Sequence, residues 1–332
     1  MTRTTPIFSA ALALAILCAC IAALHAEDNT STQITSLVNH GGANYIVGDT
    51  GTNNSLVIST GGILTNVASG YIGNAASASN NWAMITDSGS AWHNSNRFII
   101  GLSGGYNTLT ISNGARVFNL VCFIGSNTTA NGNLVLVSDS NSVWTTSGGL
   151  YVGLFGSGNQ LTITNGGRVT SFGCTVGSAD GANNNAVTIT GTGSVWTNAG
   201  DLYIGNSGAG NQLTIINSGQ VVNTYGYVGS APSASNNMVT VSGSGSVWNN
   251  SNILFVGTSG SGNKLMITNG GRVVSASGYV SNSSSVSNMV TVTGPGSIWT
   301  NSSGLYMGDY GDGNSLIIIN GGQFRGLRWQ SV

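Results

Sequence analysis

A repeat of about 26 residues runs through almost the whole chain and constrains its fold more than any other feature. Five tryptophans follow one another at steps of 52, 52, 52 and 51 residues: Trp92, Trp144, Trp196, Trp248 and Trp299. Each 52-residue unit divides into two similar halves, because the segment Leu161–Thr164 in one half corresponds to Val187–Thr190 in the next. A fixed short period of this kind indicates small structural units stacked in one direction.

Each repeat holds three short apolar segments separated by bends rich in Gly, Asn and Ser, which is typical of short strands and tight turns. Such strands bury an apolar face when one coil stacks on the next, and every strand then has a parallel neighbour. The sequence therefore predicts an all-β fold, a single right-handed parallel β-helix of about eleven coils of ~26 residues with three short strands per coil. A partial turn from Ser36 to Gly48 precedes these coils. A β-sandwich is the alternative, but it does not require such a period.

An asparagine stands two residues before the first strand of every coil, and we expect these asparagines to form a ladder along the rod. Asn suits a bend because it tolerates a left-handed backbone, and its amide can bond to the amide of the coil above. The ladder is predicted to form a corner and to set the register of the coils. Its members are Asn54, Asn81, Asn107, Asn133, Asn159, Asn185, Asn211, Asn237, Asn263, Asn288 and Asn314.

The second strand of each coil carries an arginine in many odd coils and a tryptophan in the even ones. Arg168 is expected to face water, and counting eight residues from the start of each first strand aligns Val169 with Val195. This alternation places Trp196 on the outer surface beside an inward Val195. We therefore predict that an arginine lies over a neighbouring indole face, a contact of about 0.5–1 kcal/mol.

An aromatic residue recurs at one outward position of the third strand and forms the candidate binding surface. The candidate glycan-stacking residues are Tyr151, Tyr203, Tyr227, Phe255, Tyr279 and Tyr306, with Tyr71 and Phe123 earlier in the same column. Ile99 and Thr175 interrupt the column. Exposed aromatic patches often mark recognition surfaces, so these rings could stack on sugars. The alternative is that the rings only cover one another along the rod.

The inward neighbours of these rings alternate between small residues and large ones, which predicts volume complementation between stacked layers. The small members are Gly70, Cys122, Cys174, Gly226 and Gly278, and the large members are Phe98, Leu150, Leu202, Leu254 and Leu305. Cys122 and Cys174 stand two coils apart, or about 9.6 Å, beyond the roughly 7 Å between Cα atoms that a disulfide spans. We predict two buried thiols.

Residues 1–26 resemble a secretory signal in composition. Arg3 precedes an apolar run from Ile7 to Leu24, and cleavage is expected after Ala26. An uncleaved membrane anchor is the alternative, since the run is nearly long enough to span a bilayer. A lipoprotein signal at Cys20 is a weaker alternative, because the apolar run continues beyond that cysteine. Residues 27–332 are then predicted to form one solenoid array without a second domain.

Charge is scarce in the chain, with a net charge of −1 and only 5% charged residues. Lys264 is the only lysine, so the basic patch that nucleic acids require is missing and a nucleic-acid partner is excluded. Membrane contact is expected only through the export signal or a missing C-terminal region. We predict no cofactor and no metal site, because His40 and His93 are isolated and Asp309 and Asp312 alone are weak evidence for calcium.

A polysaccharide lyase or hydrolase on the same scaffold is the alternative from another class of function. Such chemistry needs converging carboxylates, or acids together with calcium and a basic residue. Asp87 and Asp139 share a column two coils apart, about 9.6 Å, near the upper limit of an inverting carboxylate pair. Asn113 lies between them and no Lys or His joins them. We therefore expect solvated turn residues and no catalytic residue.

The repeat resembles the one associated with bacterial type V secretion (autotransporter) and PEP-CTERM proteins. Its pattern stands in residues Gly208–Val221, with a Gly-x-Gly-Asn start, then in Asn237–Asn249, which contains Gly-x-Gly-Ser-x-Trp, then in Leu254–Gly257. The resemblance covers nearly all of the mature chain. It implies a β-helical passenger region of an exported protein at the surface of a Gram-negative-type bacterium, associated with the outer membrane, and it supplies no catalytic residues.

Two features of the C-terminal part of this sequence differ from the pattern of that family. Neither a translocator barrel nor a Pro-Glu-Pro sorting signal follows Phe324, and the last coil lacks its closing Gly and a cap. We expect a fragment or degenerate paralogue, or an open end that docks on a partner.

The sequence thus predicts a non-enzymatic structural or adhesive surface protein whose partners are surface polysaccharide or other surface proteins. The outward Thr residues of the first strand, such as Thr162 and Thr188, could also bind ice, but Leu136 and Met266 break their row. Ordinary cross-strand pairing of threonines is the expected explanation for that face.

Overall fold

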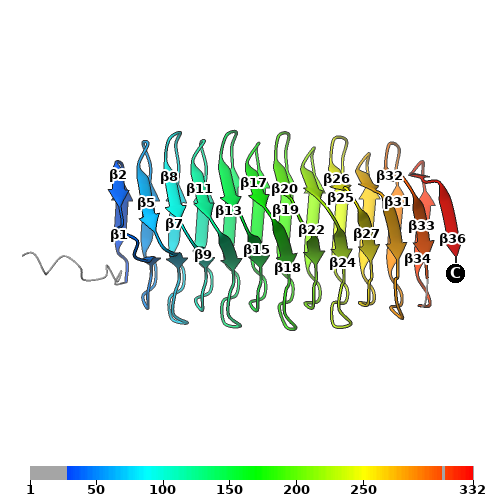
Figure 1. Cartoon of the computed structure of the whole chain (residues 1–332), viewed down its shortest axis with the longest axis horizontal. Helices are drawn as coiled ribbons and strands as arrows, with labels where there is room; N and C mark the ends of the chain where they lie inside the picture. Colours follow the sequence, from blue (N-terminus) through cyan, green and yellow to red (C-terminus); the bar gives the residue numbers. More distant parts are fainter. Residues whose placement is uncertain (1–27, 309–310, 332) are drawn as a thin grey trace, which may run out of the picture.

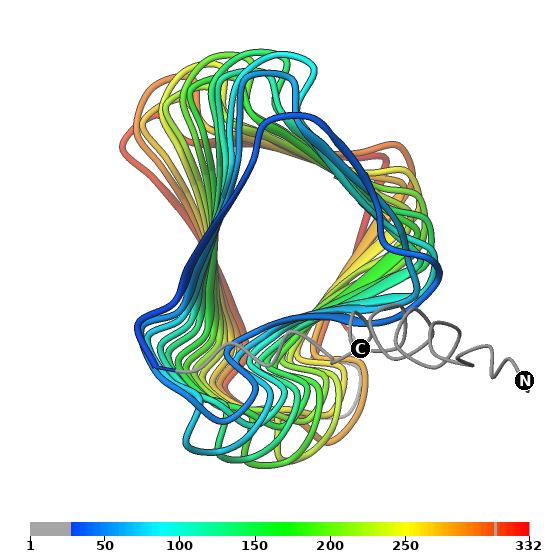
Figure 2. The same cartoon turned by 90° about the vertical axis from the view of Figure 1, so that its left-hand side faces the viewer.

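The computed structural model describes residues 28–308 and 311–331, which form a parallel β-helix (Figure 1). Seen along the rod, the coils superimpose as a three-sided outline that rotates gradually from one end to the other (Figure 2). The predicted fold class is confirmed. The predicted signal at residues 1–26 lies outside the described ranges. Within those ranges, no helix is long and apolar enough to cross a membrane.

The first strands of successive coils form one parallel sheet, here called the first sheet. Its strands in the described ranges are β1 (Ser31–Ile34), β4 (Ser55–Ile58), β7 (Trp82–Ile85), β10 (Thr108–Ile111), β13 (Leu134–Ser138), β16 (Gln160–Thr164), β19 (Ala186–Thr190), β22 (Gln212–Ile216), β25 (Met238–Ser242), β28 (Lys264–Thr268), β31 (Met289–Thr293) and β34 (Ser315–Ile319). Outward Thr residues alternate along them with buried Leu, Ile and Val, as in Gln160–Thr164.

The second strands form the second sheet, which follows a tight turn. Its strands are β2 (Leu37–Asn39), β5 (Ile63–Val67), β8 (Ala91–Asn94), β11 (Arg116–Asn119), β14 (Val143–Thr146), β17 (Arg168–Ser171), β20 (Val195–Asn198), β23 (Gln220–Asn223), β26 (Val247–Asn250), β29 (Arg272–Ser275), β32 (Ile298–Asn301) and β35 (Gln323–Arg325). The five tryptophans of the repeat lie here.

The third strands form the third sheet, and the aromatic column lies on it. Its strands are β3 (Tyr45–Val47), β6 (Gly70–Ile72), β9 (Arg97–Ile100), β12 (Val121–Ile124), β15 (Gly149–Val152), β18 (Gly173–Val176), β21 (Leu202–Ile204), β24 (Gly226–Val228), β27 (Ile253–Val256), β30 (Ser277–Val280), β33 (Gly304–Met307) and β36 (Arg328–Ser331).

The segment before the first full repeat is a complete coil rather than a partial turn. Strand β1 pairs with β4, β2 with β5 and β3 with β6, all in parallel register. Each sheet therefore has twelve strands in the described ranges, one more than the eleven coils counted from the sequence. The repeat pattern is weak in this coil because Thr30 stands where the other coils have the ladder asparagine.

The asparagine ladder is continuous, and each member from Asn54 to Asn288 is at 0% exposure, whereas Asn314 at its end is half-buried. The Oδ1 atom of each asparagine accepts two hydrogen bonds from the asparagine of the preceding coil, as Asn185 does from Asn159, one from the backbone N–H at 2.9 Å and one from Nδ2 at 3.1 Å. Thr30 starts the row, since its N–H donates to Asn54 Oδ1 at 3.0 Å. Because buried amides need these partners, the ladder allows one register only.

The prediction that the ladder asparagines themselves adopt a left-handed backbone is wrong by one residue. The positive φ angle at this corner belongs to the residue before each ladder asparagine, for example Asn184 at 57° before Asn185 and Gly158 at 66° before Asn159. A left-handed residue there turns the chain, and the ladder asparagine itself enters the strand with its side chain inward. The ladder therefore belongs to the interior of the solenoid.

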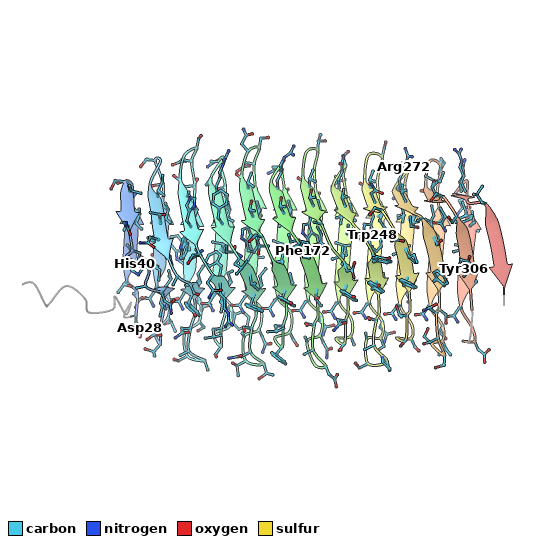
Figure 3. All side chains as sticks on the ribbon, viewed as in Figure 1. Asp28, His40, Phe172, Trp248, Arg272 and Tyr306 are labelled. Atoms are coloured by element: carbon cyan, nitrogen blue, oxygen red, sulfur yellow. The ribbon has the colours of Figure 1, made fainter. Side chains whose placement is uncertain are left out.

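The predicted outward position of the tryptophans is also wrong, because all five are at 0% exposure. The register pairs Trp196 with the buried Val169, and the partly exposed Val195 with Arg168. Arg116, Arg168 and Arg272 thus lie beside aliphatic residues, and the predicted arginine–indole contacts are not found among the described residues. Figure 3 shows Arg272 at the edge of the rod and Trp248 closer to its middle.

One extra residue in the turn explains this reversal. Three residues separate β16 from β17, whereas four, Gly191–Ser194, separate β19 from β20. Ser194 is buried, donates to the carbonyl of Thr190 at 2.7 Å and accepts the N–H of Gly166 at 3.0 Å. The longer turn shifts the second strand by one position, and a shift of one reverses which side chains face inward.

The buried indoles are accommodated by a second polar row that the sequence-based alignment missed. Trp248 Nε1 donates to Asn223 Oδ1 at 2.7 Å, and Trp196 Nε1 donates to Ser171 Oγ at 3.1 Å, each on the preceding coil. The signal was present in the preceding coils as Val-x-Asn or Val-x-Ser, since a residue two positions after an inward valine also faces inward. Trp92 differs, because Val67 stands at the acceptor position and the indole N–H has no partner in the described structure.

The predicted alternation of small and large inward residues on the third sheet is confirmed. A Cβ atom added at Gly226 would lie 2.9 Å from the ring of Trp248, so the small residues make room for the indoles. Cys122 and Cys174 are free and buried with Leu150 between them, as predicted. Burial raises the pKa of both thiols, so they are expected to behave as small apolar groups.

Replacing Asn185 with alanine is expected to destabilise the fold strongly. The backbone N–H and Nδ2 of Asn159 would both lose their buried acceptor, and each orphaned group costs about 1–3 kcal/mol. Chemical denaturation should show a loss of about 2–5 kcal/mol in the free energy of unfolding. The matched control is Asn127→Ala on the exposed surface, expected within about 0.5 kcal/mol of the wild type. Equal effects of the two changes would contradict a stabilising role of the ladder.

Candidate functional site

The aromatic column lies on the outer surface of the third sheet because outward and inward residues alternate along each third strand. Leu202 and Ile204 are buried, whereas Tyr203 between them is partly exposed. The register places Tyr203 beside Tyr227, Tyr227 beside Phe255, and so on to Tyr306. All six candidate rings therefore lie in one row, as the repeat predicts.

The rings form two stacks. The long stack contains Tyr203, Tyr227, Phe255, Tyr279 and Tyr306, with neighbouring centroids 4.5, 5.0, 5.2 and 4.5 Å apart and planes within 25° of parallel. Phe123 and Tyr151 form the short stack, 5.2 Å apart. Inside a stack the ring faces cover one another, so each ring turns its edge, and each tyrosine its hydroxyl, toward the outside. The alternative considered from the sequence, mutual covering of the rings, therefore describes the interior of both stacks.

The two interruptions of the column differ in how they are filled. Ile99 lies between Tyr71 and Phe123 and is only 2% exposed. Thr175 lies between Tyr151 and Tyr203, and there the surface is hollowed into a groove of about 510 Å³. We call this groove the Thr175 groove. It is lined by Gly149, Tyr151, Phe172, Gly173, Cys174, Thr175, Gly200, Asp201, Tyr203 and Thr224.

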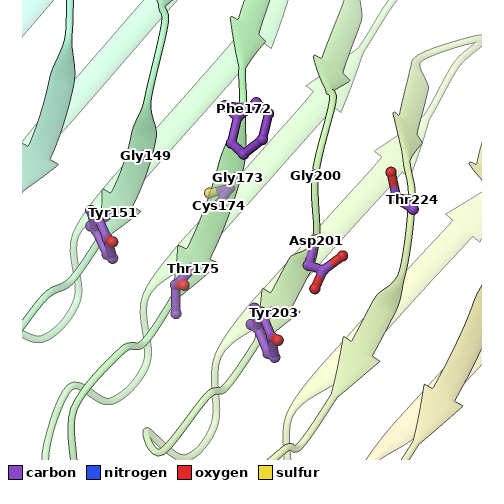
Figure 4. A pocket seen from close by; sticks show the side chains of 10 residues that line it. All are labelled: Gly149, Tyr151, Phe172, Gly173, Cys174, Thr175, Gly200, Asp201, Tyr203 and Thr224. Carbon is purple, nitrogen blue, oxygen red and sulfur yellow. The ribbon is translucent and has the colours of Figure 1, made fainter.

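Figure 4 shows Tyr151 and Tyr203 on either side of Thr175, with Phe172 at one end of the groove and Asp201 just before the strand that carries Tyr203. Phe172 is 65% exposed at the corner before β18. Asp201 is held at the equivalent corner of the next coil, where its backbone carbonyl accepts the N–H of Cys174 at 3.0 Å and Asn198 Nδ2 at 2.8 Å. The corner that carries the carboxylate is thus anchored in the interior.

The Asp201 carboxylate lies close enough to the end of the long stack to affect its phenols. Tyr203 stacks on Tyr227 with ring centroids 4.5 Å apart, and the negative charge of Asp201 acts on both phenols. Burial raises the pKa of Tyr227 to about 12, with further contributions from Tyr203 and from the negative charge of Asp201. The pKa of Tyr203 is raised by burial and then by Asp201. Both phenols therefore stay neutral and keep their hydrogens for donation at physiological pH.

The other residues singled out in the sequence lie elsewhere and are not brought together. Asp87 and Asp139 are turn residues that accept the backbone N–H groups of Thr60 at 3.1 Å and Asn113 at 3.3 Å. His40 packs on Tyr45, and His93 stacks on Phe118 at 4.6 Å. Asp309 lies outside the described residues, which contain no group of three potential metal ligands.

The Thr175 groove itself was not predicted as a site. From the sequence, Thr175 was interpreted only as an interruption of the aromatic column, and neither Phe172 nor Asp201 was predicted as a site residue. A usable signal existed, since Thr175 is the one small polar residue between two aromatic positions of the row. Whether such a gap is open or filled depends on side-chain packing, as the buried Ile99 shows.

Replacing Asp201 with asparagine is expected to lower the pKa of Tyr203 and Tyr227, because the carboxylate charge no longer opposes their ionisation. In the wild type, Tyr227 has a folded pKa of about 12 against an ordinary value of 10.0. Its contribution to stability is therefore complete below about pH 10 and is lost as the pH rises toward 12. Phenolate absorbance against pH measures this titration. Asp180→Asn, at an exposed aspartate, is the matched control, and an equal shift in it would argue against the Asp201 contact.

No family model matches the chain, and no curated protein matches it. A solved structure described as "Crystal structure of TibC-catalyzed hyper-glycosylated TibA55-350 fragment" is similar over 90% of this chain and 100% of that chain, at 16% identity and a TM-score of 0.38. A likeness of this degree carries no conclusion about function, and the family resemblance of the repeat stays a prediction.

Proposed function

We propose that this chain is an exported, non-enzymatic surface rod with a structural or adhesive role, and that its aromatic column contacts polysaccharide. The observation that supports this most is the stack of five rings along the outside of the third sheet. Aromatic rings with a polar tip combine apolar contact with hydrogen bonding, which suits surfaces that bind partners in water.

The periodicity of the column favours a polymer as the partner. Stacked coils repeat the same edge and hydroxyl at about 4.8 Å, so a chain of repeating sugar units can touch several coils at once. Linked weak contacts of this kind add up to useful avidity without any single strong site. The small net charge of −1 suits an uncharged polymer better than a strongly charged one.

Export is expected to remove residues 1–26. Expression of the full-length sequence in a Gram-negative host should yield a protein outside the cytoplasm whose N-terminus, read by Edman degradation, begins at Glu27. Retention of the protein in the cytoplasm would contradict the proposed export. A mature N-terminus at Cys20 would instead identify a lipoprotein, and an intact Met1 in the membrane fraction would identify an anchor.

Removing two rings from the far end of the column should weaken polysaccharide binding. The wild type is tested for retention on cellulose, xylan, mannan and starch, with reducing ends measured in the same samples. The double variant Tyr279→Ala with Tyr306→Ala is expected to bind about tenfold more weakly, a loss of about 1.4 kcal/mol. Leu37→Ala, at a residue 68% exposed on the second sheet, is the control and should bind as the wild type does.

The outcomes separate the candidate functions. Lack of retention on every polymer would reject the carbohydrate-binding proposal, and new reducing ends would reject the non-enzymatic one. Equal retention of the double variant and the wild type would place the binding surface away from this end of the column.

A further inference from the structure

The Thr175 groove is the place in the described aromatic column where ring faces are left uncovered between two stacks. We propose that this groove binds one uncharged pyranose ring, held between the faces of Tyr151 and Tyr203, and that it is the primary sugar subsite of the rod. This inference rests on the proposed polysaccharide contact and names where and how it is made.

The uncovered faces follow from the stacking on each side. Tyr151 has one face against Phe123 at 5.2 Å, and Tyr203 has one face against Tyr227 at 4.5 Å. The register puts Thr175 directly between the two tyrosines, so their remaining faces point toward each other across it. A sugar ring stacks through its C–H face, which an edge-on ring inside a stack does not offer. Within the column, face stacking is therefore available at this groove.

The spacing of the two rings leaves room for a single flat ring. Tyr151 and Tyr203 are two coils apart, about 9.6 Å along the rod. A guest midway would lie about 4.8 Å from each ring, close to the 4.5–5.2 Å centroid spacings found along the rest of the column. Thr175 is too short to reach as far from the sheet as the rings on either side. The groove volume of about 510 Å³ is within the usual range of ligand sites.

Polar groups around the groove suit sugar hydroxyls. The Thr175 hydroxyl lies at the floor, the Asp201 carboxylate at one side and the tyrosine hydroxyls at the rim (Figure 4). A carboxylate accepts hydrogen bonds from neighbouring hydroxyls, which gives orientation as well as affinity. None of the ten lining residues is Lys, Arg or His, so an acidic sugar would meet Asp201 without a compensating positive charge. The groove therefore favours neutral sugars over uronic acids.

The groove is built on rigid elements, which reduces the entropy lost on binding. Both tyrosines stand in strands of the third sheet, and each is stacked on a neighbouring ring, Tyr151 on Phe123 and Tyr203 on Tyr227. Gly173 keeps the floor open, since a Cβ atom added there would find only the carbonyl oxygen of Asp201, at 3.9 Å. The other interruption offers no comparable space, because Ile99 is itself buried.

Filling the groove with an aromatic side chain tests the inference. Thr175→Tyr inserts the ring that most other coils carry at this position, so it should join the two stacks and keep the fold. Isothermal titration with cellohexaose, xylohexaose and mannohexaose measures binding, and thermal unfolding confirms that the variant is folded. Binding of at least one hexaose by the wild type, and at least about tenfold weaker binding by Thr175→Tyr, is the expected result. Thr214→Tyr, the same change on the first sheet at a similarly exposed threonine, is the matched control.

A second variant and a charged probe keep the test decisive. Tyr151→Leu removes one wall of the groove and should also weaken hexaose binding about tenfold. This variant tests the subsite even if Thr175→Tyr does not fold. Oligogalacturonate should bind the wild type at least about tenfold more weakly than the preferred neutral hexaose, and Asp201→Asn should narrow that difference.

Three results would overturn the subsite while leaving the proposed function standing. In the first, the wild type retains a polysaccharide but binds no neutral hexaose. In the second, the folded Thr175→Tyr variant binds the hexaose as tightly as the wild type does. In the third, the wild type binds oligogalacturonate more tightly than any neutral hexaose. Failure of the wild type to retain any polymer would reject the proposed function itself.

Discussion

Stacking of buried asparagine amides is the interaction on which the rest of this solenoid depends. Each Oδ1 accepts two hydrogen bonds from the coil before it, with the amide at 0% exposure. A buried amide that missed its partner would lose about 1–3 kcal/mol, so a slip of one residue at any coil is strongly disfavoured. Because the register is the same from coil to coil, residues at equivalent positions form straight rows, and a surface row such as the aromatic column follows from that order.

The length of one turn decides which side chains fill the interior. Ser194 and its equivalents lengthen the turn by one residue in each coil that carries one of the five repeat tryptophans and place the indole inside. The inward indole then packs against a small residue, such as Gly226, on the preceding coil, and from Trp144 onward its N–H donates to an acceptor there, such as Asn223. Three features that look independent in the sequence, the serine, the glycine and the asparagine, are thus consequences of one buried ring.

The same regularity limits what the outer column can do. Rings that stack at 4.5–5.2 Å stabilise the sheet surface but cover each other's faces, which leaves edges and hydroxyls for a partner. Recognition by face stacking becomes available where the regular row is broken and the break is not filled. Thr175 provides such a break and Ile99 does not, because the isoleucine is buried between its neighbours. Under the proposed function, the departures from the repeat are the positions where a ligand is expected to bind.

The sequence by itself determined the fold class, the period of the coils, the asparagine ladder, the free cysteines and the membership of the aromatic column. Each of these follows from a residue type recurring at a fixed step, and stacking turns a fixed step into a row. Only the tertiary structure decided that Trp196 is buried, since a one-residue change in the turn reverses the side of the sheet. It alone showed the Thr175 groove, because an open or filled gap depends on how neighbouring side chains pack in space rather than on their spacing along the chain.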